Sequence, residues 1–134
     1  MREEFKVHRG LLFTVLLAVT SLSQAGDVDL PRYPSISPDG ANVVFSWRGD
    51  LWLVPTDGGD AQRLTTHPGV DTRSSWHPEG GLIAFESNRD GYRNIWVMEP
   101  DGSDIRQVVK TDRYALLNDF GPAPAGSDEP MITF

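Results

Sequence analysis

Beyond residue 26, apolar residues form short runs of four to six residues, separated by turns that contain glycine, proline and aspartate. The runs are rich in valine, isoleucine, phenylalanine and tryptophan, and segments such as 42–46 and 82–87 have the length of strands. No segment after residue 26 shows the period of about 3.6 residues that an amphipathic helix needs. The pattern therefore predicts an all-β chain.

The runs and turns repeat along the chain. Matching positions are Pro38 with Pro78, Phe45 with Phe85, and Trp52 with Trp96. The first two pairs are 40 residues apart and the third pair is 44 residues apart, so the second unit has four extra residues. They fall within Ser87–Asn94 and predict a longer hairpin loop. Pro-Asp-Gly at 38–40 suits a tight turn, because proline presets φ and glycine accepts a positive φ.

Four antiparallel strands in 40 to 44 residues are typical of one blade of a β-propeller. The predicted fold is a partial β-propeller, with a first blade over about 32–66, a second over about 72–110 and the start of a third over about 115–134. The matching aromatic residues are expected to pack between neighbouring blades. A β-sandwich is the alternative, but it does not require the same turn and aromatic residue at corresponding positions.

The third unit begins in the sequence as the first two do. Leu116–Phe120 is expected to form its first strand, Gly121–Gly126 its turn and Met131–Phe134 its second strand. Propellers close with about 4 to 8 blades, and each blade buries its faces only against its neighbours. Two blades and part of a third leave apolar faces bare, so we expect the chain to be the N-terminal part of a longer protein.

The first 25 residues have the layout of a secretory signal peptide. Three basic residues precede the apolar core Leu11–Val19, and small residues precede a cleavage site after Ala25. A membrane anchor or a buried helix is the alternative, but the run is too short to cross about 30 Å of hydrocarbon. The prediction is a signal helix over 1–25 and a periplasmic or secreted propeller over 26–134, with no membrane span after cleavage.

Composition and charge narrow the function classes. The 134 residues include 19 acidic and 12 basic side chains, for a net charge of −7, and no cysteine. Without cysteine the chain has neither disulfides nor thiolate metal sites, so its stability must come from packing even in an oxidising compartment. The negative charge argues against nucleic acid as a partner, because phosphate binding needs clustered lysine and arginine.

The chemical groups of a nucleophilic triad lie close together in the sequence. They are His67, Asp71, Ser74, Ser75 and His77. One histidine follows the first unit, the other stands beside a turn proline, and no Gly-x-Ser-x-Gly elbow is present. The acidic turns at 57–60 and 101–104 lack the spacing of an EF-hand. We therefore predict structural roles for all of them, with no catalytic residue, no cofactor and no metal ligand in this chain.

Two further groups of residues allow both a structural and a functional interpretation. Arg89, Arg93 and Arg106 are expected to form surface or inter-blade pairs with carboxylates. Trp47 and Trp52 are able to line a peptide groove, but core packing is the simpler interpretation.

Several segments resemble TolB-type, WD-like propeller repeats. They are SPDG at 37–40, GDLWLVP at 49–55, GG at 58–59, RLTTHP at 63–68 and SNRDG at 87–91. In the first unit, the succession of GDLW-VP, Gly-Gly and RLT-HP is similar to the start of tricorn-protease-like proteins. The resemblance covers about residues 32–134, strongly in the first two units and weakly in the third.

The resemblance to tricorn-like proteins implies a larger parent with a second β domain, a PDZ domain and a C-terminal serine-protease domain. The propeller would gate or guide peptides toward the protease chamber, and the catalytic residues of the family would lie outside this chain. The predicted function is thus a non-catalytic N-terminal propeller of an exported tricorn-like serine peptidase. Its expected partners are peptides or proteins, and the full-length parent could form a homo-oligomer. The alternatives are a TolB-like envelope scaffold and a ligand-binding propeller, both without a protease partner.

Overall fold

The computed structural model describes residues 29–121 and 131–134 of the chain. Within these residues the regular secondary structure consists of β-strands alone, which confirms the all-β prediction. The predicted signal peptide at 1–25 and most of the predicted third turn lie outside the described residues. Within the described ranges, no helix is long and apolar enough to span a membrane.

The first sheet contains four antiparallel strands in the order of the chain. They are β1 (Arg32–Ile36), β2 (Asn42–Trp47), β3 (Asp50–Pro55) and β4 (Gln62–Arg63). The turn between β1 and β2 closes as predicted, with Gly40 at a φ of +73°. The Ser37 hydroxyl donates a hydrogen bond to Asp39 Oδ1 at 2.5 Å. This bond, together with one from the Ala41 amide, lowers the pKa of Asp39.

The second sheet repeats this order. Its strands are β5 (Asp71–Trp76), β6 (Ile83–Ser87), β7 (Asn94–Met98) and β8 (Arg106–Val109). The matching aromatic residues pair in the same register, Phe45 opposite Trp52 in the first sheet and Phe85 opposite Trp96 in the second. The loop between β6 and β7 spans 88–93, whereas the loop between β2 and β3 spans 48–49, which accounts for the four extra residues.

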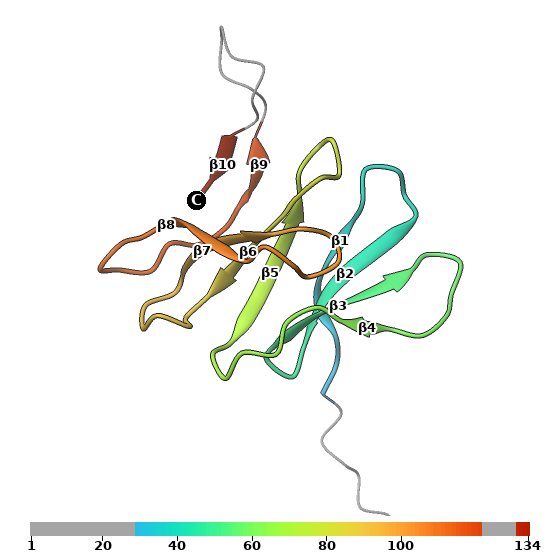
Figure 1. Cartoon of the computed structure of the whole chain (residues 1–134), viewed down its shortest axis with the longest axis horizontal. Coiled ribbons are helices and arrows are strands. Elements are labelled where there is room, and N and C mark those ends of the chain that lie inside the picture. Colours follow the sequence, from blue (N-terminus) through green and yellow to red (C-terminus); the bar gives the residue numbers. More distant parts are fainter. Residues whose placement is uncertain (1–28, 122–130) are drawn as a thin grey trace, which may run out of the picture.

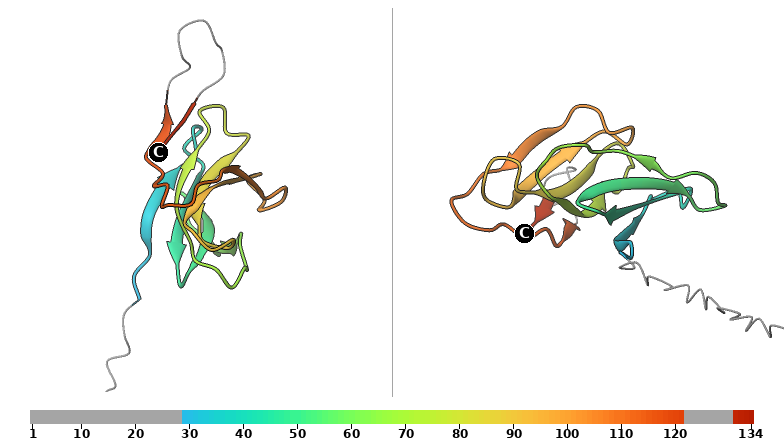
Figure 2. Two further views of the ribbon diagram at one scale, coloured as in Figure 1. Left: turned by 90° about the vertical axis from the view of Figure 1, so that its left-hand side faces the viewer. Right: turned by 90° about the horizontal axis from the view of Figure 1, so that it is seen from below.

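The two sheets pack face to face, and the first strands β1 and β5 lie next to each other (Figure 1, Figure 2). The core between them consists of Val44, Leu51, Leu64, Trp76, Ile83, Phe85 and Met98, with Leu53, Trp96 and Ile105 at its edge. The prediction that matching aromatic residues pack between sheets therefore holds for Phe85 and Trp96. Alternate residues of a strand face opposite sides, so Phe45 and Trp52 lie on the other face of the first sheet. No strand among the described residues packs on that face.

A third pair of strands lies beyond the second sheet, β9 (Asp119–Gly121) and β10 (Met131–Thr133). They pair antiparallel as expected, although β9 begins three residues later than the predicted strand. Leu116 and Leu117 precede β9, and Leu117 is buried in a second core with Ala84, Ile95 and Val97. This core continues the stacking of the sheets.

Equivalent hydrogen bonds join successive units. The Asp71 amide donates to Gly49 O at 2.8 Å, and 44 residues later the Ala115 amide donates to Arg93 O at 2.9 Å. In the same way, the Arg73 amide donates to Ser46 Oγ at 3.2 Å and the Leu117 amide to Glu86 Oε1 at 2.8 Å. Ser46 and Glu86 are 40 residues apart. The repeat therefore specifies the interface between units as well as the units themselves.

Both first strands contain a bulge that the sequence pattern does not predict. The register shifts between Arg32 and Ser35 in β1 and between Thr72 and Ser74 in β5. The bulged residues, Tyr33 with a φ of +52° and Arg73 with a φ of +46°, are again 40 residues apart. Both bulges lie close to the ends at which β1 and β5 begin.

Candidate functional site

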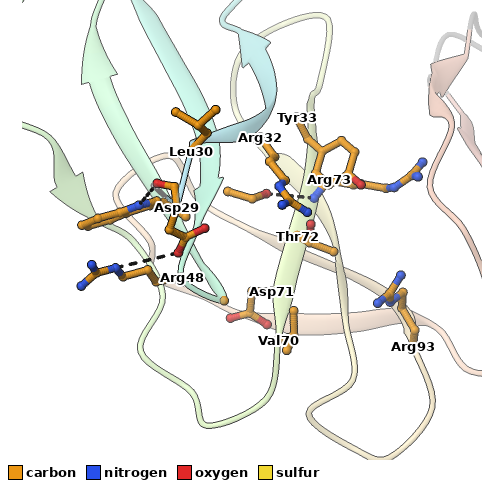
Figure 3. A pocket seen from close by; sticks show the side chains of 13 residues that line it. Asp29, Leu30, Arg32, Tyr33, Arg48, Val70, Asp71, Thr72, Arg73 and Arg93 are labelled. Atoms are coloured by element: carbon orange, nitrogen blue, oxygen red, sulfur yellow. Dashed lines mark hydrogen bonds and ion pairs between the residues drawn. The ribbon is translucent and has the colours of Figure 1, made fainter. Parts of the chain in front are cut away.

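A pocket of about 360 Å³ opens at the end of the sheet interface where β1 and β5 begin. Three segments form most of its wall: the approach to β1, the turn between β2 and β3, and the start of β5 (Figure 3). Four of its lining residues are arginines, namely Arg32, Arg48, Arg73 and Arg93. We call this site the arginine pocket.

Left-handed backbone conformations gather around the arginine pocket. In the described part of the chain, four residues other than glycine have a positive φ, and Tyr33, Arg48 and Arg73 all line this pocket. The fourth is Asp104, between β7 and β8. A left-handed conformation costs a non-glycine residue roughly 1–2 kcal/mol. Such strain persists where the surrounding structure compensates for it, and it concentrates at binding and active sites.

The side chain of Arg73 is held between two neighbours. Its guanidinium carbon lies 4.7 Å from the ring centre of Tyr33, which is a cation–π contact between the two bulged residues. Its Nε lies 3.9 Å from Glu86 Oε1. These contacts orient the guanidinium while leaving 42% of the side chain exposed.

Glu86 is a fully buried carboxylate behind the arginine pocket. Burial raises its pKa, whereas the Leu117 amide and the charges of Arg73 and Arg93 act in the opposite direction. Arg93 Nη1 lies 3.5 Å from Glu86 Oε2, and this oxygen has no hydrogen-bond partner in the described structure. Two guanidiniums therefore share one carboxylate, and neither forms a close hydrogen bond with it.

Asp71, in contrast, is neutralised within the second sheet. Its carboxylate is fully buried and accepts two hydrogen bonds from Arg89 Nη2, both at 3.0 Å. The Arg89 guanidinium also lies over Trp96 at 4.8 Å. The expectation of a surface or inter-blade pair is thus wrong for Arg89: its side chain is 11% exposed and its partner belongs to the same sheet. Arg106 does form an exposed pair, with Asp104.

The charges around the pocket do not cancel. Arg48 pairs with Asp29 at 3.8 Å, and Arg32 has no ion pair among residues 29–121 and 131–134. Together with Arg89 and Glu86, the pocket residues comprise five arginines and the three carboxylates of Asp29, Asp71 and Glu86, which leaves two positive charges in excess. The pocket is therefore positively charged in a chain whose net charge is −7.

The residues considered for a nucleophilic triad are separated by other contacts. His67 Nδ1 accepts the Gly69 amide at 2.9 Å, and His77 Nδ1 accepts the Glu79 amide at 3.1 Å. The Ser75 hydroxyl donates to Asp119. Both histidines thus stabilise local turns, and the lack of catalytic and cofactor residues in the chain remains a prediction.

The acidic turns form bonds of their own. The neighbouring Ser103 hydroxyl and amide lower the pKa of Asp101, and the amide donates a hydrogen bond to Asp101 Oδ1 at 2.8 Å. Among the residues that the structure describes, no three histidine, aspartate or glutamate side chains converge as metal ligands do.

Trp47 does not have the core position that the sequence favours for it. It belongs to neither hydrophobic core, and it contributes to the wall of the arginine pocket. Its Nε1 donates to Asp29 O at 2.9 Å, and its ring meets that of Trp52 edge-on at 5.3 Å. Core packing within the described residues is therefore the wrong explanation for Trp47.

Sequence reasoning missed Arg32, Arg48 and Arg73, because they are widely spaced and belong to no motif. One signal was available. Alignment of the two units at an offset of 40 residues places Arg73 opposite Tyr33, and the fold brings this pair into contact.

Stacked four-stranded antiparallel sheets with repeated interface bonds define a β-propeller. The family model described as "TolB beta propeller domain" matches residues 19–125, and the chain belongs to this family. Protein Atu1656 of Agrobacterium fabrum is 31% identical over 111 residues, which cover 78% of this chain and 36% of that protein.

Named relatives come from two groups. "Tol-Pal system protein TolB" of Helicobacter hepaticus is 35% identical over 78 residues, covering 55% of this chain and 19% of that protein. "Tricorn protease homolog 1" of Streptomyces coelicolor is 31% identical over 78 residues, covering 58% of this chain and 7% of that protein. The chain thus spans little more than a third of the length of Atu1656 and less of the other two.

Solved structures agree with this assignment. A putative TolB from Agrobacterium tumefaciens superposes with a TM-score of 0.61 at 27% identity, over 74% of this chain and 37% of that one. The tricorn protease superposes with a TM-score of 0.55 at 18% identity, over 72% and 10%, and this likeness concerns the fold alone. The predicted partial propeller and the resemblance to both TolB-type and tricorn-like proteins are confirmed.

Proposed function

We propose that this chain is a non-catalytic propeller module that binds peptide segments of protein partners in the arginine pocket. The main support is the coincidence of three strained residues, Tyr33, Arg48 and Arg73, with an excess of positive charge in a single pocket. The bulges of β1 and β5 and the two-residue loop at 48–49 set these backbone conformations. Tyrosine and arginine, rather than glycine, occupy these positions and contribute large polar side chains to the pocket wall.

The finer proposal concerns the parent protein. The chain would be the N-terminal propeller of an exported tricorn-like serine peptidase, where it gates or guides peptides toward catalytic domains outside this chain. The match to tricorn protease homolog 1 supports this assignment, as does the GDLWLVP segment at 49–55. Export would depend on the predicted signal peptide at 1–25.

The alternative is a TolB-like envelope scaffold with no protease partner. The family match over 19–125 and the TolB relative from Helicobacter hepaticus favour it. The two proposals share the binding module and differ in the domains that the parent protein carries after it. Reading the coding sequence beyond Phe134 separates them: PDZ and serine-protease segments support the peptidase, and a stop after further blades supports the scaffold.

Photo-cross-linking tests the shared proposal. The photoreactive residue p-benzoylphenylalanine would replace Val70, which lines the pocket and is 43% exposed. Val108 in β8 is 45% exposed and provides the matched control position. From a pool of random octapeptides, we expect the Val70 position to capture more peptide than the Val108 position. Equal capture at both positions would refute peptide binding in the pocket.

A further inference from the structure

We infer that the arginine pocket recognises acidic side chains, so that its ligand is a peptide segment with aspartate or glutamate residues. This inference rests on the proposed function and specifies the chemistry of the ligand. It depends on three features of the pocket: free hydrogen-bond donors, a preset guanidinium and the size of the charge excess.

Donors remain available on two of the arginines. Charge-assisted hydrogen bonds between guanidinium and carboxylate measure about 2.7–2.9 Å, whereas Arg73 and Arg93 lie 3.9 and 3.5 Å from Glu86. A guanidinium has five N–H groups, and the shared carboxylate leaves most of those on Arg73 and Arg93 unused. An entering carboxylate would find them in place.

The Arg73 guanidinium is also set in position before a ligand arrives. The bulge in β5 and the hydrogen bond from its amide to Ser46 fix its backbone, and the Tyr33 ring supports the guanidinium from one side. Such preorganisation reduces the entropy that binding would otherwise cost. A planar guanidinium held in this way favours a planar partner such as a carboxylate.

The excess of positive charge in the pocket indicates how many anionic groups the ligand carries. Two uncompensated positive charges match one or two carboxylates. A polyanion such as nucleic acid would meet repulsion from the rest of a chain with a net charge of −7. The arginines also come from four separate segments: β1, the turn between β2 and β3, β5 and the loop before β7. Side chains spaced along an extended peptide reach these segments better than a single terminal carboxylate does.

Three fluorescein-labelled octapeptides test the inference by fluorescence anisotropy with the full chain. The acidic peptide has a central Asp-Glu pair and both ends capped. The amide peptide has Asn-Gln instead, and the third peptide is the amide peptide with a free C-terminal carboxylate. We expect the acidic peptide to bind at least about tenfold more tightly than either of the others, and added salt to reduce the difference.

Arg32→Ala is the first variant, because the Arg32 side chain is exposed and has no ion pair among the described residues. We expect it to weaken binding of the acidic peptide at least about fivefold, with Arg32→Lys intermediate. Arg106→Ala removes an exposed arginine outside the pocket and should leave binding unchanged.

The outcomes separate this inference from the proposed function. If acidic and amide peptides bind equally and both lose affinity in Arg32→Ala, the pocket binds peptides but does not select carboxylates. Preference for the free C-terminus over the acidic pair would likewise overturn the inference. If Arg32→Ala binds the acidic peptide as the wild type does, the pocket assignment itself fails.

Discussion

The interface between the first two sheets ends in two different pockets. At one end, which we call the turn end, a pocket of about 480 Å³ is lined by the turns that follow β1 and β5 and by Trp76. These turns contain Pro-Asp-Gly and Pro-Glu-Gly at matching places, and none of the described residues that line this pocket is an arginine. At the other end, which we call the arginine end, lies the arginine pocket. Its residues differ between the two units: Tyr33 in the first corresponds to Arg73 in the second, and Arg48 lies in a loop that is longer in the second unit.

The difference separates residues that build the fold from residues that build the site. The turn end follows directly from the repeat, because both units carry the same kind of turn at this place. The arginine end keeps the repeated backbone, with equivalent bulges and interface bonds, but it presents side chains that are not repeated. Function in this chain is thus expected where the repeat of sequence fails while the repeat of structure continues.

The largest loss of stability is expected from Arg89→Ala, because Arg89 pairs with Asp71, which lines the arginine pocket. Asp71 would become a buried carboxylate without its partner, a change that typically costs about 3–5 kcal/mol. Urea unfolding followed by tryptophan fluorescence gives the free energy of unfolding.

Arg106→Ala serves as the control for this variant, because its pair with Asp104 is exposed and pairs of that kind contribute about 0–1 kcal/mol. If the two variants lose similar stability, the buried pair does not support the arginine end.

A change at the turn end should cost less and affect no ligand. Gly80 has a φ of +80°, and a Cβ added there would cause no clash, because its nearest neighbour would be Pro38 at 3.9 Å. Gly80→Ala should therefore lose roughly 1–2 kcal/mol from backbone strain alone. Gly81→Ala is the neighbouring control, since its Cβ would meet nothing and its φ is not left-handed. Comparable losses in both variants would show that the turn is not held by the glycine conformation.

At the arginine end, replacing Arg48 by glycine tests the same backbone strain in the opposite direction, because the change should relieve strain. Its φ is +52°, and its side chain is 66% exposed. Arg48→Gly and Arg48→Ala both remove the guanidinium, but only alanine retains the strain, so the glycine variant should be more stable by about 1 kcal/mol. Equal unfolding free energies would mean that the left-handed backbone stores no strain there.

The smallest effect is a pH dependence at Glu86. Burial raises the pKa of the folded-state carboxyl above its ordinary value of 4.5. The folded chain then holds this proton more tightly than the unfolded chain, so the contribution of Glu86 to stability is greatest below pH 4.5 and is lost as the pH rises through the raised pKa. Relative to wild type, Glu86→Gln should gain stability as the pH rises from 4.5 through the raised pKa of Glu86.

Ser46→Ala is the matched control for Glu86, because Ser46 occupies the corresponding position in the first sheet and accepts the equivalent amide hydrogen bond. Its stability difference from wild type should stay constant over the same pH range. A parallel drift in both variants would place the titrating group elsewhere.

Much of the fold is predictable from the sequence, because turns and strand faces depend on local chemistry. Pro38 and Gly40 set a turn, the spacing of Phe45 and Phe85 sets the repeat, and the extra residues after Ser87 predict the longer loop. The packing of Phe85 between sheets is predictable too, since it needs only a neighbouring blade.

The arginine pocket is not predictable from the sequence, for physical reasons. Its four arginines follow one another at intervals of 16 to 25 residues, and they line one pocket only after the sheets stack. The bulges at Tyr33 and Arg73 involve no glycine that would indicate a positive φ. The burial of Glu86 depends on the next unit along the chain, because Leu117 covers that side of the second sheet.

One titration tests most directly whether the ligand binds at the arginine end. Trp47 lines the arginine pocket and Trp76 lines the pocket at the turn end, so each reports on one end through its fluorescence. With the unlabelled acidic octapeptide, we expect a saturable change in tryptophan emission that is lost in Trp47→Phe and kept in Trp76→Phe. A change that survives in Trp47→Phe and disappears in Trp76→Phe would place binding at the repeated turns and contradict the account.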